Sequence, residues 1–286
     1  DAYSDSNGNL NRVFKQIYRS QTNVLIISCF LLPSLIYFGS TIHKEGLILA
    51  ALGTLFYCIY NVLHSSGFTF RRVFFISVSI IFIFLLRNFV LLALIPGIIG
   101  WVICEKCKAK PIVIFSSVYA VSILLFFLVG EFIPSLNLPE YVVEKQLAFK
   151  SLEKANSAID INLLEPTVKS FAVNLPQAFA NSLFRPFITD GKTLKFLYLL
   201  ALEIVLYELL FVVFLFFKRD NSKFFDNPFI VFGLFFSFSL LLLIGYTTPI
   251  LGAIVRYRSV YLPFIFTPVL CGINIQKLLA FLQIKK

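Results

Sequence analysis

Residues 73–104 read VFFISVSIIFIFLLRNFVLLALIPGIIGWVIC and carry a single charged side chain before the final cysteine, Arg87. One straight helix over this stretch would be about 48 Å long, at a rise of about 1.5 Å per residue. The hydrocarbon core of a bilayer is only about 30 Å thick. We therefore expect two short membrane crossings that meet at Arg87, with a re-entrant hairpin as the alternative.

The composition of the whole chain is typical of polytopic membrane proteins. Of its 286 residues, 58% are hydrophobic and 14% are charged, and the mean hydropathy is +0.86. A soluble domain is closer to half apolar and a quarter charged, so one water-soluble core could not hide this excess. The net charge of +10 comes without an aromatic and basic motif for RNA or DNA, and we expect no nucleic-acid partner.

The apolar runs predict an all-α transmembrane bundle of about eight spans. Splitting the long run at Arg87 keeps the loops in phase, so that lysines and arginines fall in every segment on one side. The positive-inside rule requires this distribution of cytoplasmic segments. We expect a multi-pass protein of the bacterial inner membrane with both chain ends in the cytoplasm. The expected spans are 22–38, 47–63, 73–87, 89–104, 112–130, 195–217, 228–246 and 260–281.

These spans divide the chain into three parts: N-terminal spans over 1–130, an outer loop over 131–192, and C-terminal spans over 193–286. Because the chain begins at Asp1 and contains no methionine, we expect further residues upstream.

The outer loop predicts two amphipathic segments that lie on the membrane surface. The first starts at LPE, residues 138–140, where a proline opens a helix. In the second, Pro176 is expected to separate two short helices. The apolar face of this second segment consists of Val168, Phe171, Ala172, Leu175, Phe179 and Leu183.

Four cations lie in short outer connections, against the positive-inside tendency. They are Lys44, Arg87, Arg256 and Arg258. Arginine forks match phosphate oxygens in pairs, so we expect these cations to converge on an anion, with Asn88 and Tyr257 beside them. In an extended loop over 247–259, Arg256 and Arg258 would point the same way. The alternative is that each cation only contacts lipid head groups.

The stretch GSTIHKEG, residues 39–46, adds two candidate catalytic residues, His43 and Glu45. Activating a sugar hydroxyl needs a positioned carboxylate or histidine. The alternative for Glu45 is a carboxylate that stabilises the N-terminus of the next helix. One histidine and one glutamate two residues apart are a poor metal site. We expect no metal or other cofactor, with a divalent cation as an optional addition.

Glu203 and Glu208 interrupt the apolar run LYLLALEIVLYELLFVVF. Ionisable residues in lipid are expensive, which makes both of them candidates for a structural or proton-linked role. Five residues apart on a helix, they do not share a face. One of them is expected to pair with Arg87 or with an arginine of the last outer loop.

Two stretches resemble known membrane proteins. LLPSLIYFGSTIHKEGLILAALGTLFY (31–57) is similar to a pattern in multi-span bacterial envelope proteins, in which a basic and an acidic residue start a span. TTPILGAIVRYRSVYLPFIF (247–266) resembles a late Arg-Tyr-Arg-x-x-x-x-Pro element of proteins that handle polyprenyl-linked sugars. The wider likeness is to O-antigen polymerases and ligases, C-type (GT-C) glycosyltransferases and flavobacterial-type membrane proteins. The chain departs from the C-type enzymes because it lacks their first outer loop.

This resemblance implies transfer or polymerisation of polyprenyl-(pyro)phosphate-linked sugars at the outer face, with arginines on the phosphates and a histidine or carboxylate on the acceptor. The expected partners are membrane lipid and a polyprenyl-linked glycan. Two other functions stay open. A proton-coupled transporter or flippase would use Glu203 and Glu208, and a non-catalytic subunit would dock a protein partner through 131–192.

Overall fold

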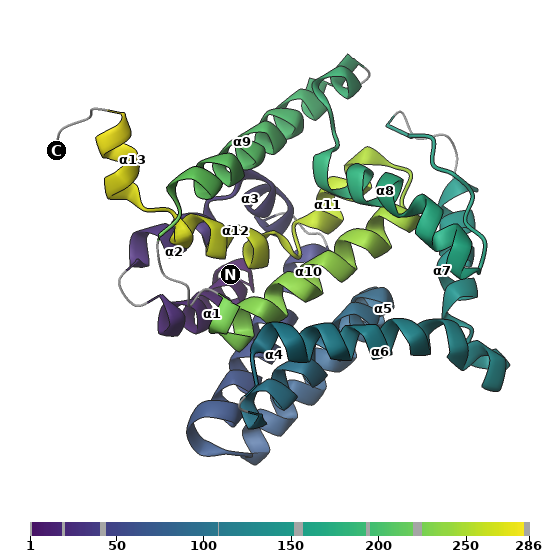
Figure 1. The fold of residues 1–286 in the computed structure, drawn as a ribbon, viewed down its shortest axis with the longest axis horizontal. Coiled ribbons are helices and arrows are strands. Elements are labelled where there is room, and N and C mark those ends of the chain that lie inside the picture. The colour runs from purple at the N-terminus through teal and green to yellow at the C-terminus, as the bar shows by residue number, and fades with distance from the viewer. Residues whose placement is uncertain are drawn as a thin grey trace.

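The computed structural model describes residues 2–18, 21–40, 44–107, 109–151, 157–192, 195–219 and 225–282. Within these ranges the chain is helical, and its only extended pairings are two isolated bridges, Ala158 with Ile250 and Lys218 with Ile273. Figure 1 shows the arrangement of the helices. They are α1 (Ala2–Ile17), α2 (Thr22–Phe30), α3 (Pro33–Ser40), α4 (Lys44–Asn61), η1 (Val62–Ser66), α5 (Phe70–Lys106), α6 (Pro111–Phe132), η2 (Pro134–Leu136), α7 (Leu138–Lys150), α8 (Val168–Phe184), η3 (Ile188–Lys192), α9 (Lys195–Phe217), α10 (Pro228–Thr247), α11 (Leu251–Arg258), α12 (Leu262–Gly272) and α13 (Ile275–Phe281).

Five helical segments in the described ranges are long and apolar enough to cross a membrane. They are Lys44–His64, Phe70–Lys106, Pro111–Phe132, Leu197–Phe217 and Pro228–Thr247. The all-α fold is thus as expected. Eight separate spans are not confirmed, because the runs at 22–38 and 260–281 are each divided into two short helices.

The breaks in those two runs have local causes. Pro33 begins α3, and the residue before a proline is disfavoured in helical geometry, so α2 ends ahead of it. At the other end of the chain, α12 stops at Gly272 and Asn274 starts a new helix. The side chain of Asn274 accepts a hydrogen bond from Lys277 N at 3.1 Å, which caps α13.

The long helix α5 turns back on itself at Arg87, where the backbone is extended (φ −157°, ψ 87°). A straight helix from Phe70 would carry Glu105 about 52 Å away. Glu105 Oε1 instead lies 3.4 Å from Nε2 of His64, and the link from His64 to Phe70 reaches at most about 21 Å. The expected meeting of two helical segments at Arg87 therefore agrees with the contacts at both ends of α5.

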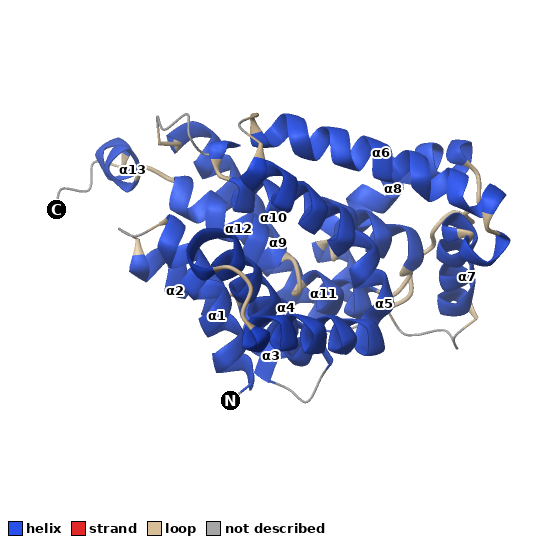
Figure 2. Cartoon of the chain, turned by 90° about the horizontal axis from the view of Figure 1, so that it is seen from below, coloured by secondary structure: helices blue, strands red, loops and turns tan. Residues whose placement is uncertain are grey.

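Two ends of the bundle can be distinguished by their contacts. At the Glu45 end lie the start of α4, the turn at Arg87, α7 and α11. At the His64 end lie η1, the last turn of α5, the start of α10 and the junction of α12 with α13. Figure 1 and Figure 2 place α7 and α13 at opposite ends of the molecule.

The helix α1 differs from the expectation that the residues ahead of 22 form a basic segment outside the spans. In the structure α1 packs along α4, with Val13 and Phe14 buried. Asn9 Nδ2 donates to Thr54 Oγ1 at 3.3 Å. Apolar residues at helical spacing give α1 one face that packs against the core. The polar opening DAYSDSNGN makes this face hard to recognise in the sequence.

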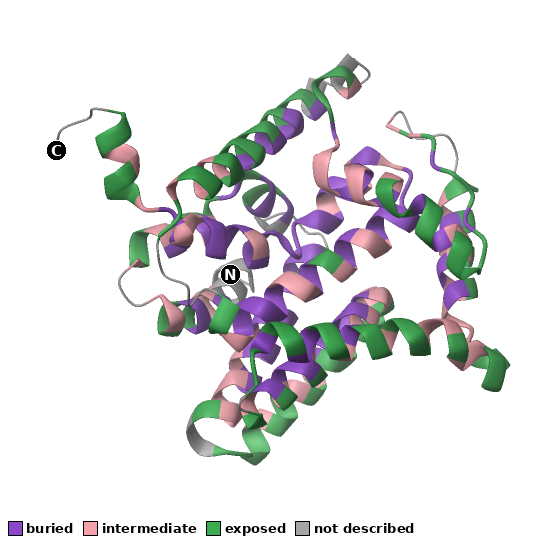
Figure 3. Cartoon of the chain, in the orientation of Figure 1, coloured by how far each residue is buried: buried purple, intermediate pink, exposed green. Residues whose placement is uncertain are grey.

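Aromatic rings fill the centre of the bundle around α10. The Phe56 ring of α4 makes edge contacts with Phe232 and Phe264, with ring centroids 5.1 and 5.4 Å apart. Trp101 lies 5.1 Å from Phe229, centroid to centroid. Of the residues in the most apolar stretch of α6, 11% are buried, compared with 67% in that of α10. The colours of Figure 3 show the same decrease in burial toward α6. The exposed apolar side chains of α6 suit contact with lipid.

The segment 131–192 contains the two expected helices, α7 and α8. A proline does open α7, and Asn137 caps it. The expected division of α8 at Pro176 is wrong, because the helix runs without interruption through that residue. Packing on α10 explains its persistence, since Gly245 has no side chain and the backbone of α8 at Ala178 lies directly against it.

The apolar face expected on α8 is only partly turned toward the core, with Phe179 and Leu183 half-buried against it. Val168 is 61% exposed and Leu175 is 41% exposed. Of the expected face, only Phe171 is buried. The other buried residues of α8 are Asn174, Ala178, Asn181 and Ser182. Of these polar side chains, Asn174 is held by another segment, because its Oδ1 accepts a hydrogen bond from Nδ2 of Asn162 at 3.0 Å.

Candidate functional site

A cavity of about 430 Å³ lies at the Glu45 end. Four separate elements supply its charged walls: the first turn of α4, the turn of α5 at Arg87, α7 and α11. The polar and charged residues that line it are Lys44, Glu45, Arg87, Asn88, Tyr141, Lys145, Thr247, Arg256 and Tyr257. A cavity of this size can hold a small ligand or the polar part of a larger one.

Glu45 is the buried centre of the charge cluster, with its side chain 1% exposed. Its Oε1 accepts a hydrogen bond from Nη2 of Arg87, which is itself 8% exposed. The Nε of Arg256 lies 3.3 Å from the same oxygen. Because one carboxylate faces two guanidinium groups, it fixes both of them at the edge of the cavity.

Tyr257 forms the aromatic part of this wall. The guanidinium carbon of Arg87 lies 3.5 Å from the Tyr257 ring centroid, in a cation–π contact. Nη2 of Arg256 donates to the Tyr257 hydroxyl at 3.2 Å. Phe89 and Phe149 flank the ring, with centroids 6.2 and 6.4 Å away. The two arginines are therefore held by stacking as well as by Glu45.

The cavity carries a surplus of positive charge. Its lining has four cationic side chains, from Lys44, Arg87, Lys145 and Arg256, and one carboxylate, Glu45, which leaves three positive charges. Lys44 and Asn88 are exposed at the rim. Lys145 was not among the expected site residues. Lys145 stands one helical turn after Tyr141, and its Nζ lies 5.3 Å from the centroid of the Tyr141 ring. This spacing is the feature of the sequence that could have indicated Lys145 as a site residue.

Arg258 does not join the other three expected cations, which corrects the prediction. Residues 251–258 form the helix α11 rather than an extended loop. Two residues on a helix are about 200° apart, so Arg256 and Arg258 point to opposite sides. Arg258 is 1% exposed, and its Nη1 donates to Leu183 O at 3.3 Å and Arg185 O at 2.9 Å. Burial lowers the pKa of its guanidinium.

The two glutamates of α9 have different surroundings, as their spacing predicts. Glu203 is buried, and its Oε1 accepts from Ser34 N at 2.9 Å and from the Tyr207 hydroxyl. It therefore anchors the start of α3. Glu208 is exposed on α9 and lines an apolar cavity. Among the described residues neither glutamate forms an ion pair with an arginine, although Glu203 is an electrostatic neighbour of Arg258.

His43 lies outside the described residues, so its place relative to the cavity is not part of this geometry. In the ranges that the structure describes, no group of three or more histidine, cysteine or acidic residues is placed to hold a metal ion.

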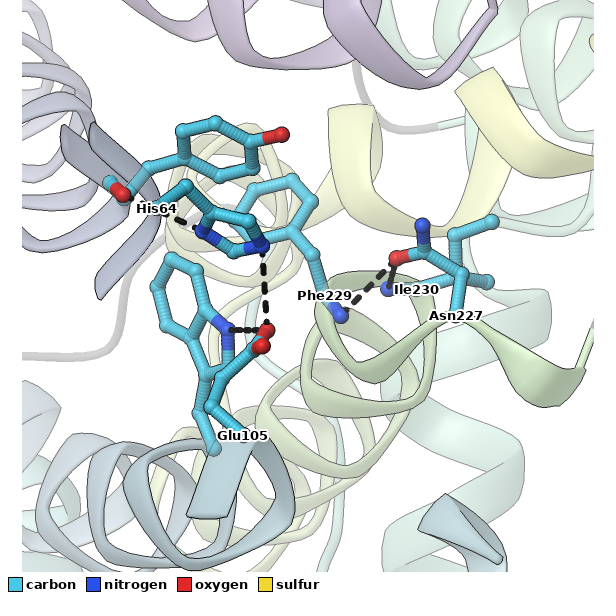
Figure 4. A network of polar contacts seen from close by, with 7 residues as sticks. His64, Glu105, Asn227, Phe229 and Ile230 are labelled. Carbon is cyan, nitrogen blue, oxygen red and sulfur yellow. Dashed lines mark hydrogen bonds and ion pairs between the residues drawn. The ribbon is translucent and has the colours of Figure 1, made fainter. Parts of the chain in front are cut away.

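The His64 end holds a second polar cluster, drawn in Figure 4. Nε2 of His64 lies 3.4 Å from Glu105 Oε1, and the Trp101 indole donates to the same oxygen at 3.2 Å. The imidazole stacks on Tyr60, centroid to centroid 4.1 Å. Beside it, Asn227 Oδ1 accepts from Phe229 N and Ile230 N and caps α10.

No family model matches the chain, and comparison with curated proteins and with solved structures finds no similar protein.

Proposed function

We propose that the protein binds a phosphate-bearing, polyprenyl-linked glycan in the basic cavity and transfers or polymerises its sugar. The observation that supports this proposal is the convergence of Lys44, Arg87, Lys145 and Arg256, from four elements, on one cavity of about 430 Å³. A fixed pair of guanidinium groups suits the oxygens of a phosphate or diphosphate. The apolar helices around the cavity suit a substrate that is itself anchored in lipid.

For Glu45 the geometry favours a positioning role over direct acid–base chemistry. Its carboxylate is 1% exposed and faces both Arg87 and Arg256. To act as a base it would have to leave both guanidinium groups and reach the substrate. In this proposal Glu45 holds the arginines, and His43 is the candidate group for the acceptor hydroxyl.

We further propose that the protein lies in the bacterial inner membrane with the Glu45 end facing outward. The basic residues of the loops at the His64 end support this orientation by the positive-inside rule. They include Arg71, Arg72, Lys110, Lys218 and Arg219. Cysteines introduced at Lys145 and at Lys110 should react with membrane-impermeant reagents from opposite sides. Labelling of both from one side would contradict the orientation.

Binding can be tested with purified protein in lipid nanodiscs and farnesyl diphosphate as the probe, with farnesol and inorganic diphosphate as comparison ligands. Farnesyl diphosphate should bind at least about tenfold more tightly than farnesol, because a charge-assisted hydrogen bond is worth roughly 1.5–3 kcal/mol and 1.4 kcal/mol is tenfold. Arg256→Gln and Lys145→Gln should each remove much of this difference. The matched control is Arg71→Gln, an exposed arginine at the His64 end. Equal weakening by the control would contradict a specific site.

Turnover can be separated from binding through His43. In a reaction with lipid-linked saccharides extracted from bacterial membranes, the wild-type protein should release polyprenyl diphosphate. His43→Ala should bind farnesyl diphosphate normally and lose this release, because a general acid or base typically contributes about 10²–10⁴-fold. Binding without any release by the wild type would instead favour a non-catalytic subunit.

A proton-coupled transporter receives less support from the described residues. Glu203, the buried carboxylate of α9, accepts hydrogen bonds from a backbone N–H and from Tyr207, as expected of a structural anchor. Glu208 is the remaining candidate for a proton-linked role. A Glu208→Gln variant that abolished pH-driven uptake into proteoliposomes would favour the transporter.

A further inference from the structure

A second cavity lies on the opposite side of α11, between α8, α9, α10 and α12. Its volume is about 820 Å³, and its walls are almost entirely apolar, with Phe179, Phe211, Phe238, Ile265 and Val269 among the lining residues. Arg258 and Glu208 also line it. They do not form an ion pair with each other or with another residue of the described chain.

Arg258 has unused hydrogen-bonding capacity at this cavity. The side chain is 1% exposed, and its Nη1 donates hydrogen bonds to two backbone carbonyls. Its Nε and Nη2 meet no hydrogen-bond acceptor among the described residues. A buried guanidinium with unpaired N–H groups is costly, and the two free groups form the fork that binds two oxygens of a phosphate.

Glu208 supplies the opposite charge. It stands in the middle of an apolar helix, where an ionisable side chain is unfavourable unless a partner offsets it. Glu208 lines the same cavity as Arg258. One cavity thus offers a cation with free donors, a carboxylate and room for hydrocarbon chains.

We propose that this cavity binds a zwitterionic phospholipid with a primary ammonium group, of the phosphatidylethanolamine kind. The lipid phosphate accepts from Nε and Nη2 of Arg258, the ammonium group donates to Glu208, and an acyl chain fills the apolar space beside Phe211 and Phe238. The site goes beyond the proposed function, because α11 separates it from the basic cavity and no residue lines both.

The test uses purified protein in nanodiscs with a Phe238→Trp reporter and phospholipids brominated on their acyl chains. The protein without the reporter, in which Trp101 is the only tryptophan, gives the background. Brominated phosphatidylethanolamine should quench the reporter at about fivefold lower mole fraction than phosphatidylglycerol, since an accessible ion pair is worth up to about that factor. Phosphatidylcholine, whose ammonium has no N–H donor, should quench less than phosphatidylethanolamine.

Two variants assign the contacts. Glu208→Gln should remove the preference for phosphatidylethanolamine over phosphatidylglycerol, whereas Glu144→Gln, an exposed carboxylate on α7, should keep it. Arg258→Gln should weaken quenching by both lipids about tenfold. If Arg258→Gln does not fold, the loss of selectivity in Glu208→Gln still decides. Equal quenching by all three lipids, or unchanged selectivity in Glu208→Gln, would overturn the proposal. So would a folded Arg258→Gln that binds both lipids normally, because Arg258 would then only offset the charge of Glu203.

Discussion

The two ends of the bundle both carry basic residues, but they use them differently. At the Glu45 end, cations from four elements meet around one buried carboxylate and line a cavity. At the His64 end, Nε2 of His64 lies 3.4 Å from Glu105 Oε1, and the two side chains are 36% and 21% exposed. Positive charge in the sequence is therefore a weak guide to a site. Convergence on a buried counter-charge separates the two ends.

The largest expected effect is the loss of that counter-charge. Glu45→Ala leaves Arg87 buried without its carboxylate, and removing one partner of a buried ion pair typically costs about 3–5 kcal/mol. Unfolding in mixed detergent micelles should show this loss of free energy. Glu105→Ala, at the His64 end, should cost about 1 kcal/mol or less, because its contact with His64 is partly solvated.

A conservative variant distinguishes charge from packing at Glu45. Glu45→Gln keeps the shape and one acceptor oxygen, so it should lose less stability than Glu45→Ala. If both variants cost no more than Glu105→Ala, the cluster at the Glu45 end would not be held by its buried ion pair, and the contrast between the ends would fail.

The next largest effect concerns the close packing of α8 against α10 at Gly245. Gly245 lets α8 approach α10 so closely that an added Cβ would overlap the carbonyl of Ala178. Gly245→Ala should therefore destabilise the protein by about 1–3 kcal/mol, as overpacking does, because backbone has to move. At the His64 end, an added Cβ on Gly100 would meet the ring of Phe115 at 2.9 Å, and a ring yields more readily.

Thermal unfolding in detergent can compare these glycines. We expect Gly245→Ala to lower the midpoint more than Gly100→Ala does. Gly252→Ala is the control, since its nearest neighbour would be Ser157 Oγ at 4.0 Å, and alanine favours a helix over glycine. A midpoint for Gly245→Ala equal to that of Gly252→Ala would mean that α8 is not fixed by this approach.

Much of the fold could be predicted from the sequence, because helical spans depend on local properties. The runs at 112–130, 195–217 and 228–246 each form one long helix, because they are strongly apolar and contain no proline that would break the helix. The turn at Arg87 followed from length alone. The broken runs at 22–38 and 260–281 were missed because Pro33 and Gly272 act through backbone geometry, which a count of apolar residues ignores.

The site was harder to predict, because it depends on helix rotation and tertiary contact. Three of the four expected cations line one cavity, but Arg258 points away, since α11 is a helix where an extended loop was expected. Lys145 was missed because the rotation of α7 against its neighbours, with Val142 and Gln146 buried, decides which of its side chains reach the cavity. The burial of Asn174 on α8 was missed for a similar reason: its Oδ1 accepts a hydrogen bond from Asn162, a tertiary contact that hydrophobic spacing does not report.

The smallest expected effect tests the His64 end itself. His64→Gln removes the contact with Glu105 and the stacking on Tyr60, but Trp101 still donates to Glu105 at 3.2 Å. Because the pair is partly exposed, the free energy of unfolding should fall by about 1 kcal/mol or less. Binding of farnesyl diphosphate should be unchanged, because His64 lies at the end opposite the basic cavity. A loss of binding in a variant of unchanged stability would mean that the two ends are coupled, and that the cavity at Glu45 depends on more than the residues that line it.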